Sequence, residues 1–323
     1  MILNFVIFLI ASFLCFTIPG IFLLQKSKIS FSFLEKLTLG TVIGFVGFTL
    51  LAYIFMALRG PFLILPITAL IVLTSFKIIT GLKINLKNYS KKQLSILLII
   101  FVLGIAGQMA IVAPSGLKVS QDLVFYSSNG HDGPWHIALI GEMKKGYPLQ
   151  NPVFAGERLV NYHFFSDIAP AQFSQFFRFS NLDLYFRFFP FLFSLLLGAM
   201  AFLLGRKLGN SFNAGVWSTF FVYFVGSFGF LVTWMQNRTL GGESIFWASQ
   251  IQSSVGNPPQ IISSFLILTI IYLFIILLPR KNLILFAIST LLVGTLVEFK
   301  IYASVVVLIS LAIVGIMQFI KEG

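Results

Sequence analysis

Long apolar runs separated by short polar segments dominate the pattern along this chain. A helix needs about 20 mainly apolar residues to cross the hydrocarbon layer of a membrane. Read on that length, the pattern predicts about nine membrane-spanning helices and therefore an all-α, polytopic helical membrane protein. The predicted spans are Ile2–Leu24, Thr38–Leu58, Phe62–Thr80, Leu94–Ala113, Leu184–Leu204, Phe212–Met235, Ile261–Leu278, Leu283–Val297 and Ile301–Ile320.

Composition excludes a water-soluble globule. Of the 323 residues, 58% are hydrophobic and 10% are charged, and the mean hydropathy is +0.96. Ordinary soluble domains are about 45–50% apolar and about 25% charged. The single cysteine, Cys15, also excludes an internal disulfide framework. The first apolar run lacks a charged leading region and a small-residue cleavage site, so we expect it to remain as a span.

The basic residues predict an orientation, because cytoplasmic loops carry an excess of Lys and Arg. With the N-terminus outside, more than half of the 22 basic residues face the cytoplasm of a prokaryotic cell, across its plasma membrane. This placement accounts for the net charge of +12 without a nucleic-acid partner. The cytoplasmic set is Lys26, Lys28, Lys36, Lys77, Lys83, Lys87, Lys91, Lys92, Arg206, Lys207, Arg280, Lys281 and Lys321.

Three regions follow from this pattern. Residues 1–113 form four spans, residues 114–183 form a long extracytoplasmic loop, and residues 184–323 form five more spans with a polar outer loop at 236–260. All three histidines lie in the first loop, together with the acids Asp122, Asp132, Glu142, Glu157 and Asp167. This clustering makes the loop the candidate site.

Two helices at the membrane surface are predicted in the first loop. Asp132 or Gly133 can cap a helix that continues through Met143, with Pro134 in its first turn. Trp135, Leu139 and Met143 form an apolar stripe on it, which is typical of a helix lying at the membrane surface. A second helix is predicted over Pro170–Phe179.

Asp132 and His136 are four residues apart, so their side chains can share one face of that helix. Two interpretations are open. The carboxylate and the imidazole can take part in chemistry, or Asp132 can act only as a helix cap while His136 serves as an interfacial aromatic.

The loop also resembles a known family. The residues that carry the resemblance are Asp132, then Glu142-Met143, Gly146, Asn151-Pro152, Gly156 and Asn161-Tyr162-His163. They are similar to the first periplasmic loop of GT-C glycosyltransferases, especially bacterial protein O-mannosyltransferases and lipid A aminoarabinose transferases. Gly133 stands where those enzymes commonly carry a second acid, and Asn161-Tyr162-His163 replaces a block of Lys-Pro-Pro type. The resemblance implies transfer of a sugar from a polyprenyl-phosphate carrier at the outer membrane face, with Asp132 as the catalytic acid residue.

The chemistry of such a transfer suits these residue types. A lipid phosphate is a good leaving group, so the protein needs a base near the acceptor hydroxyl and positive charge near the phosphate. Asp132 is the candidate base, and Arg158, Arg238, Lys118 and Lys300 are candidates for holding phosphate oxygens. We expect His131, His136, Tyr162 and His163 to contact the substrate. The acceptor is not predicted.

Glu298 and Lys300 form a second feature, between the last two predicted spans. Ionisable groups this close to hydrocarbon favour a function in binding substrate. The alternative is that they are the polar tips of a tight outer turn and extend to the interface. The polar loop 236–260 can line a sugar site or satisfy its own backbone.

Two other classes of function would use the same residues. A carrier or flippase for a lipid-linked precursor would also use a basic outer site, but its path would need more charge within the spans. A metal-dependent hydrolase would need more ligands than His131, Asp132, His136 and His163 offer at their spacing, so no metal cofactor is predicted.

Overall fold

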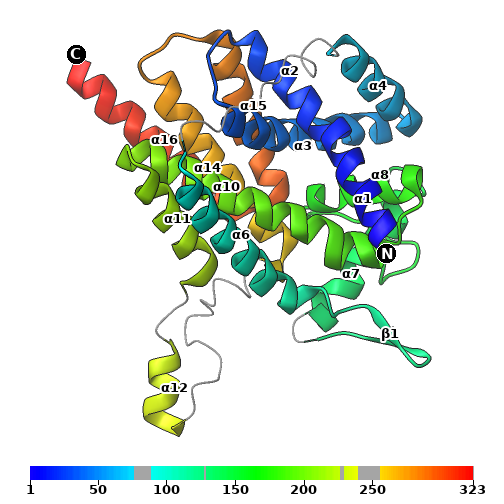
Figure 1. The fold of residues 1–323 in the computed structure, drawn as a ribbon. Helices are drawn as coiled ribbons and strands as arrows, with labels where there is room; N and C mark the ends of the chain where they lie inside the picture. Colours follow the sequence, from blue (N-terminus) through cyan, green and yellow to red (C-terminus); the bar gives the residue numbers. More distant parts are fainter. Residues whose placement is uncertain (76–88, 127–128, 226–228, 239–254, 323) are drawn as a thin grey trace.

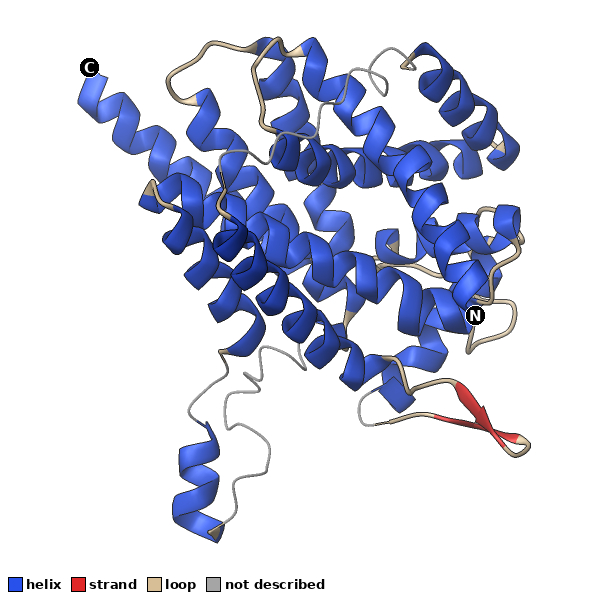
Figure 2. Ribbon diagram, in the orientation of Figure 1, coloured by secondary structure: helices blue, strands red, loops and turns tan. Residues whose placement is uncertain are grey.

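The computed structural model describes residues 1–75, 89–126, 129–225, 229–238 and 255–322. Within these residues the chain is helical except for one two-stranded hairpin and connecting loops (Figures 1 and 2). The predicted cytoplasmic lysines Lys77, Lys83 and Lys87 lie outside the described residues, and so does most of the predicted polar loop 236–260.

The elements in chain order are α1 (Ile2–Ser12), η1 (Phe13–Thr17), α2 (Ile18–Lys26), α3 (Phe33–Ala57), η2 (Pro61–Leu63), α4 (Ile64–Thr74), α6 (Lys91–Val112), β1 (Leu117–Val119), β2 (Asp122–Val124), α7 (Asn129–Met143), α8 (Phe165–Phe177), α9 (Asn181–Asp183), η3 (Leu184–Phe188), α10 (Phe189–Gly209), α11 (Phe212–Phe224), α12 (Gly229–Asn237), α14 (Pro258–Leu277), α15 (Leu283–Phe299) and α16 (Ile301–Glu322).

Six helices of the described chain are long and apolar enough to cross a membrane. Two of them contain a π-helical turn: η1 joins α1 to α2, and η3 joins α9 to α10. The others are α3, α6, α14 and α16. This confirms the predicted all-α, polytopic class.

The remaining three predicted spans differ from single long helices. Pro61–Thr74 and Leu283–Phe299 are apolar but shorter than the other spans. The predicted span Phe212–Met235 is not one helix, because α11 ends at Phe224 and Val225 is extended.

Phenylalanine fills the centre of the bundle around α10, which packs against α3, α6, α11 and α14. Phe16, Phe45, Phe173, Phe189 and Phe193 are all at most 1% exposed. The ring centroids of Phe16 and Phe173 are 5.2 Å apart, and those of Phe45 and Phe193 are 5.4 Å apart. Edge and offset contacts of this kind stabilise a core beyond the burial of the rings.

Small residues bring the first two spans into close contact. A Cβ added to Gly44 would lie 1.8 Å from the carbonyl oxygen of Phe16, and one added to Gly20 would lie 1.8 Å from that of Gly40. The hydroxyls of Thr17 and Thr41 are hydrogen-bonded across this contact at 2.9 Å. Close approach through small residues is a common way for helices to associate in lipid.

Both predicted helices of the long loop are present, but each begins earlier than predicted. The start of α7 is Asn129, whose Nδ2 donates to the carbonyl of Ile111 at 3.0 Å and so ties the helix to the end of α6. The start of α8 is Phe165 rather than Pro170. The prolines lie inside the helices because tertiary contacts before them extend the helical segment.

The apolar stripe of α7 was expected to face the membrane surface, but it packs against protein instead. Leu139 and Met143 are at most 1% exposed, and α7 packs against α8, α9 and η3. The preceding hairpin, β1 with β2, was not predicted, and Figure 1 shows it projecting from the bundle.

Polar groups gather at two opposite ends of the bundle. Tyr53, near the end of α3, packs against Phe164 and Phe165 of the long loop at 5.9 and 5.2 Å. Glu35 lies at the start of the same helix, about 27 Å away at 1.5 Å per residue. That separation is close to the hydrocarbon thickness of about 30 Å. We call the two ends the loop end and the Glu35 end.

Replacing Gly44 tests the helix contact. Gly44→Ala should lower the melting temperature of the detergent-solubilised protein clearly, because its Cβ meets backbone that cannot move aside. The cost should exceed the roughly 1–3 kcal/mol of ordinary overpacking. Gly47→Ala is the matched control on the same helix, since nothing lies within 4 Å of its added Cβ. Equal melting temperatures for the two variants would contradict the contact.

Candidate functional site

Helix α7 is held at both ends, which positions the side chains along it. Its first residue is bonded to the end of α6, as described above. Near its C-terminal end, Lys144 Nζ donates to Ser174 Oγ of α8 at 3.0 Å and to Asn181 Oδ1 of α9 at 3.3 Å. Lys144 therefore links three helices.

Asp132 lies in the first turns of α7 with its carboxylate accessible. The side chain is 42% exposed and accepts a hydrogen bond from His131 Nδ1 at 2.7 Å. The His131 side chain itself is 93% exposed. A carboxylate in this state is open to an incoming hydroxyl group.

One turn further along α7, His136 is buried against Asp167 of α8. His136 Nδ1 donates to both carboxylate oxygens of Asp167, at 2.9 and 3.0 Å. The exposed fractions of the two side chains are 5% and 1%. Ser166 Oγ donates to the same carboxylate at 3.3 Å. Because Nδ1 is committed to Asp167, Nε2 is the ring nitrogen of His136 left for another partner.

Aromatic rings surround this buried pair. Tyr185, in the π-helical turn η3, stacks on His136 with a centroid distance of 5.4 Å. Tyr162 contacts Trp135 edge-on at 5.4 Å and stacks on His163 at 4.9 Å. Burial raises the pKa of the Tyr162 phenol to about 12, and the negative charge of Asp167 adds to this effect. Tyr162 therefore keeps its proton and can donate it in a hydrogen bond.

Lys300 brings a positive charge to this cluster from the other end of the chain. It is the single extended residue between α15 and α16, half-buried, with Nζ 3.4 Å from Asn257 Oδ1. Burial lowers the pKa of its ammonium group, while the carboxylate of Asp132 acts in the opposite direction. Lys300 also interacts electrostatically with His136 and His163.

Buried His136 and half-buried His163 respond to this environment in opposite ways. Burial alone would lower the pKa of His136, but the charge and hydrogen bonds of Asp167 outweigh it and raise the pKa. Burial and then the charge of Lys300 lower the pKa of His163. At neutral pH, His163 is therefore a neutral imidazole.

The structure thus brings together five of the residues singled out from the sequence: Asp132, His136, Tyr162, His163 and Lys300. His131 joins them at the exposed edge through Asp132.

Four other predicted site residues lie elsewhere. Lys118, a candidate for holding phosphate, is exposed in strand β1 of the hairpin. Arg158 is exposed and forms an isolated β-bridge with Gln150. Arg238 stacks on Trp234 of α12, and Figure 1 shows that helix extending away from the bundle. Glu298 is half-buried and interacts electrostatically with Tyr53 rather than sharing the position of Lys300.

Asp167 is the main residue that the sequence did not single out. It was one acid among several in the loop, and its burial depends on contact between α7 and α8. In the structure its neighbours Ser166 and Ile168 are at most 2% exposed, so Asp167 belongs to a buried segment. An acid in such a segment needs a partner, and His136 supplies one.

Gly133 explains why α7 carries a single acid at this point rather than an adjacent pair. A Cβ at this position would lie 2.6 Å from Phe186 Cζ of η3. Phe186 is 1% exposed and cannot easily move aside. A second carboxylate next to Asp132 would therefore collide with the core.

A metal ion finds no ready-made site in the part of the chain that the structure describes. No group of three or more His, Cys, Asp or Glu side chains there is arranged to hold one. The first metal-binding candidates, His136 and Asp132, are directed to different partners.

The opposite pKa shifts predict opposite pH dependences for two variants. Because the folded pKa of His136 is raised, its stabilising contribution is present below the ordinary value of 6.5 and is lost as pH rises through the folded pKa. The melting-temperature advantage of the wild type over His136→Gln should therefore shrink with rising pH. For His163→Gln the advantage should grow as pH rises, because the folded pKa of His163 is lowered. Thermal unfolding between about pH 5 and about pH 9 measures both, and parallel profiles would contradict the assignment.

Comparison with protein-family models, with curated proteins and with solved structures finds no match for this chain. The cluster itself offers an accessible carboxylate, a half-buried cation, a neutral imidazole and a buried, hydrogen-bonded pair of His136 and Asp167.

Proposed function

We propose that the protein is an integral-membrane glycosyltransferase of the GT-C type. It transfers a sugar from a polyprenyl-phosphate donor to an acceptor hydroxyl at the membrane surface. The observation that carries the proposal is the meeting of Asp132 and His163, from two parts of the long loop, with Lys300 from the far end of the chain. A solvated connecting loop would not need these groups to converge.

Asp132 is the proposed base. Its carboxylate is accessible, and it belongs to a helix that is fixed at both ends. As the bond between sugar and phosphate breaks, the acceptor hydroxyl attacks the sugar carbon and its proton passes to Asp132. General-base catalysis typically contributes roughly 10²–10⁴-fold.

Lys300 and His163 are proposed to bind the donor phosphate. The phosphate leaves with the bonding electrons, so negative charge grows on its oxygens during transfer. The ammonium of Lys300 can stabilise that charge, and hydrogen bonds between ionised groups are stronger than neutral ones. His163 is neutral and can donate one N–H to a phosphate oxygen or a sugar hydroxyl.

His136 and Asp167 are proposed to position the base rather than to react. Their hydrogen-bonded side chains are buried between α7 and α8. Breaking a buried pair by removing one partner costs about 3–5 kcal/mol. The pair therefore keeps α7, and with it Asp132, in one place relative to α8.

The position of the cluster suits a substrate with a lipid tail. It lies at the loop end, about one hydrocarbon thickness from the Glu35 end. The predicted cytoplasmic residues Arg206 and Lys207 lie at the Glu35 end, in the last turn of α10. We therefore place the loop end at the outer face of a prokaryotic plasma membrane, where the donor head group meets water.

Between the two ends, the described part of the bundle is filled with phenylalanine. Phe45, Phe189 and Phe193 are buried on this path, and their rings are in contact. A carrier or flippase would need a polar route for a charged head group. The packing of this core supports transfer at one face over carriage between two.

Asp132→Asn should abolish transfer while leaving donor binding intact. We expect transfer to fall by about 10²-fold or more, because the amide cannot accept the proton. The measurement uses membranes containing the protein and undecaprenyl phosphate linked to radiolabelled mannose, glucose or 4-amino-4-deoxyarabinose. Binding of unlabelled undecaprenyl phosphate is measured separately.

Asp122→Asn is the matched control, since Asp122 is an exposed acid of the same loop in the hairpin. It should transfer like the wild type. Undiminished transfer by a correctly inserted Asp132→Asn protein would overturn the assignment of the base.

Lys300→Gln should weaken donor binding more than it slows the chemical step. Loss of one charge-assisted contact should raise KM for the donor about tenfold. Lys300→Arg should restore much of the affinity because it keeps the charge. Lys118→Gln in the exposed strand β1 is the control and should leave KM unchanged. Equal KM values for Lys300→Gln and the control would show that Lys300 does not hold the phosphate.

A further inference from the structure

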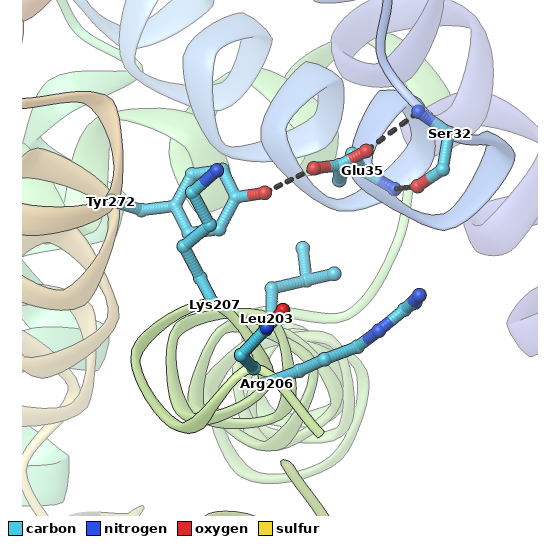
Figure 3. A pocket seen from close by; sticks show the side chains of 7 residues that line it. Ser32, Glu35, Leu203, Arg206, Lys207 and Tyr272 are labelled. Atoms are coloured by element: carbon cyan, nitrogen blue, oxygen red, sulfur yellow. Dashed lines mark hydrogen bonds between the residues drawn. The ribbon is translucent and has the colours of Figure 1, made fainter. Parts of the chain in front are cut away.

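A second polar site lies at the Glu35 end, on the opposite side of the bundle from the cluster described above. A cavity of about 250 Å³ opens there between α3, α10 and α14. Figure 3 shows Lys207 rising from the end of α10 beside the ring of Tyr272, whose hydroxyl is bonded to Glu35, while Arg206 extends sideways from the same helix. Ser32, Leu203 and Asn210 complete its lining.

A smaller cavity adjoins the first. It has a volume of about 130 Å³ and shares Glu35 and Lys207 with its neighbour. Arg280 and apolar residues including Phe31 and Ile276 line the rest. The combined space therefore presents polar groups in both parts, and the second part also borders apolar residues at the end of α14.

The carboxylate of Glu35 is fixed in place. It accepts a hydrogen bond from the backbone N–H of Ser32 at 2.6 Å, while Ser32 Oγ accepts one from the backbone N–H of Glu35 at 3.3 Å. The hydroxyl of Tyr272 donates to the other carboxylate oxygen. An ionised carboxylate has about four lone-pair sites, so these two bonds leave acceptor capacity facing the cavity.

Arg206 is also held by its surroundings. Its guanidinium lies 5.1 Å from the centre of the Tyr89 ring and donates a hydrogen bond to the Tyr89 hydroxyl. It attracts Glu35 electrostatically without forming a direct ion pair among the described contacts. A guanidinium ordered in this way keeps further N–H groups for an anion.

Positive charge at the cytoplasmic end of spans is common and by itself reports topology. Lys26 and Lys28 illustrate this ordinary case, because both are exposed and neither lines a cavity. Arg206 and Lys207 differ from them. They line a formed cavity opposite a fixed carboxylate, so cationic and anionic groups face the same space.

We propose that this cavity binds the head group of a phospholipid that carries both a phosphate and a primary ammonium. The phosphate would lie against Arg206 and Lys207, and the ammonium would donate to Glu35. The acyl chains would leave along the apolar residues beside α14. The site is independent of the proposed transfer at the loop end.

The charges select among head groups. A purely anionic head group would be attracted by Arg206 and Lys207 but would leave Glu35 without a partner. A choline head group has no N–H to donate to the Glu35 carboxylate. An ethanolamine head group satisfies both sides of the cavity at once.

Titration in detergent tests the proposal. The full-length protein is mixed with micelles containing palmitoyl-oleoyl phosphatidylethanolamine, phosphatidylcholine or phosphatidylglycerol, and the shift in melting temperature gives the apparent affinity. We expect the ethanolamine lipid to bind about tenfold more tightly than the choline lipid. Glu35→Gln should abolish that preference while keeping the helix cap, since glutamine also fits a capping box. Arg206→Gln with Lys207→Gln should weaken binding of the ethanolamine and glycerol lipids alike.

Lys26→Gln with Lys28→Gln is the matched control, because it removes the same charge at the same end outside the cavity. It should bind all three lipids like the wild type, and each variant must first show a cooperative melt without added lipid. Equal affinity for the ethanolamine and choline lipids, unchanged in Glu35→Gln, would overturn the choice of head group. Saturation by soluble phosphoethanolamine or inorganic phosphate at the same concentrations would overturn the lipid as the source of the phosphate.

Discussion

The hydrogen-bonded pair of His136 and Asp167 is the interaction on which the loop end depends. A carboxylate with 1% exposure has lost its water and must be compensated within the protein. His136 Nδ1 compensates it by donating to both carboxylate oxygens. The charge and hydrogen bonds of Asp167 in turn raise the pKa of His136. Because the partners belong to α7 and α8, the pair also fixes how these helices pack.

That packing connects the candidate base to the membrane core. Helix α8 contacts α3, α14 and α15, so its position is set by the spans. Helix α7 then follows α8 and presents Asp132 one turn before the buried pair, at the exposed start of the helix. Tyr185 closes the other face of His136 from η3, a π-helical turn in the central helix. π-helical turns often occur at functional sites, and here one delivers a ring to a histidine.

The sequence allowed the fold class to be predicted because apolar runs of span length have few other interpretations. It also allowed Asp132, His136, His163 and Lys300 to be selected, because ionisable residues are scarce in this chain and their positions stand out. Asp167 could not be selected in the same way. Its role depends on a contact between two helices separated by a loop, which no spacing along the chain reveals.

Two other differences between prediction and structure also arise from contacts or backbone geometry that local sequence does not show. The first helix of the loop was predicted to begin several residues after its actual start. Capping preferences consider only neighbouring residues, whereas Asn129 is hydrogen-bonded to Ile111 of a preceding helix. The span over Phe212–Met235 was read from hydropathy alone, which does not weigh the break in helical backbone at Val225. Arg158 and Arg238 were chosen by charge, and charge does not determine which face of a loop a residue occupies.

The depth of Lys300 follows from the geometry of the last two helices. Helix α15 has 17 residues, which gives about 26 Å at 1.5 Å per residue. This is less than the hydrocarbon thickness of about 30 Å, so its end does not reach far into water. With one extended residue before α16, the chain has no loop that could carry Lys300 outward. The ammonium is therefore held half-buried beside Asp132 and His163, where a dry environment makes its charge more effective toward a phosphate than it would be on an exposed loop.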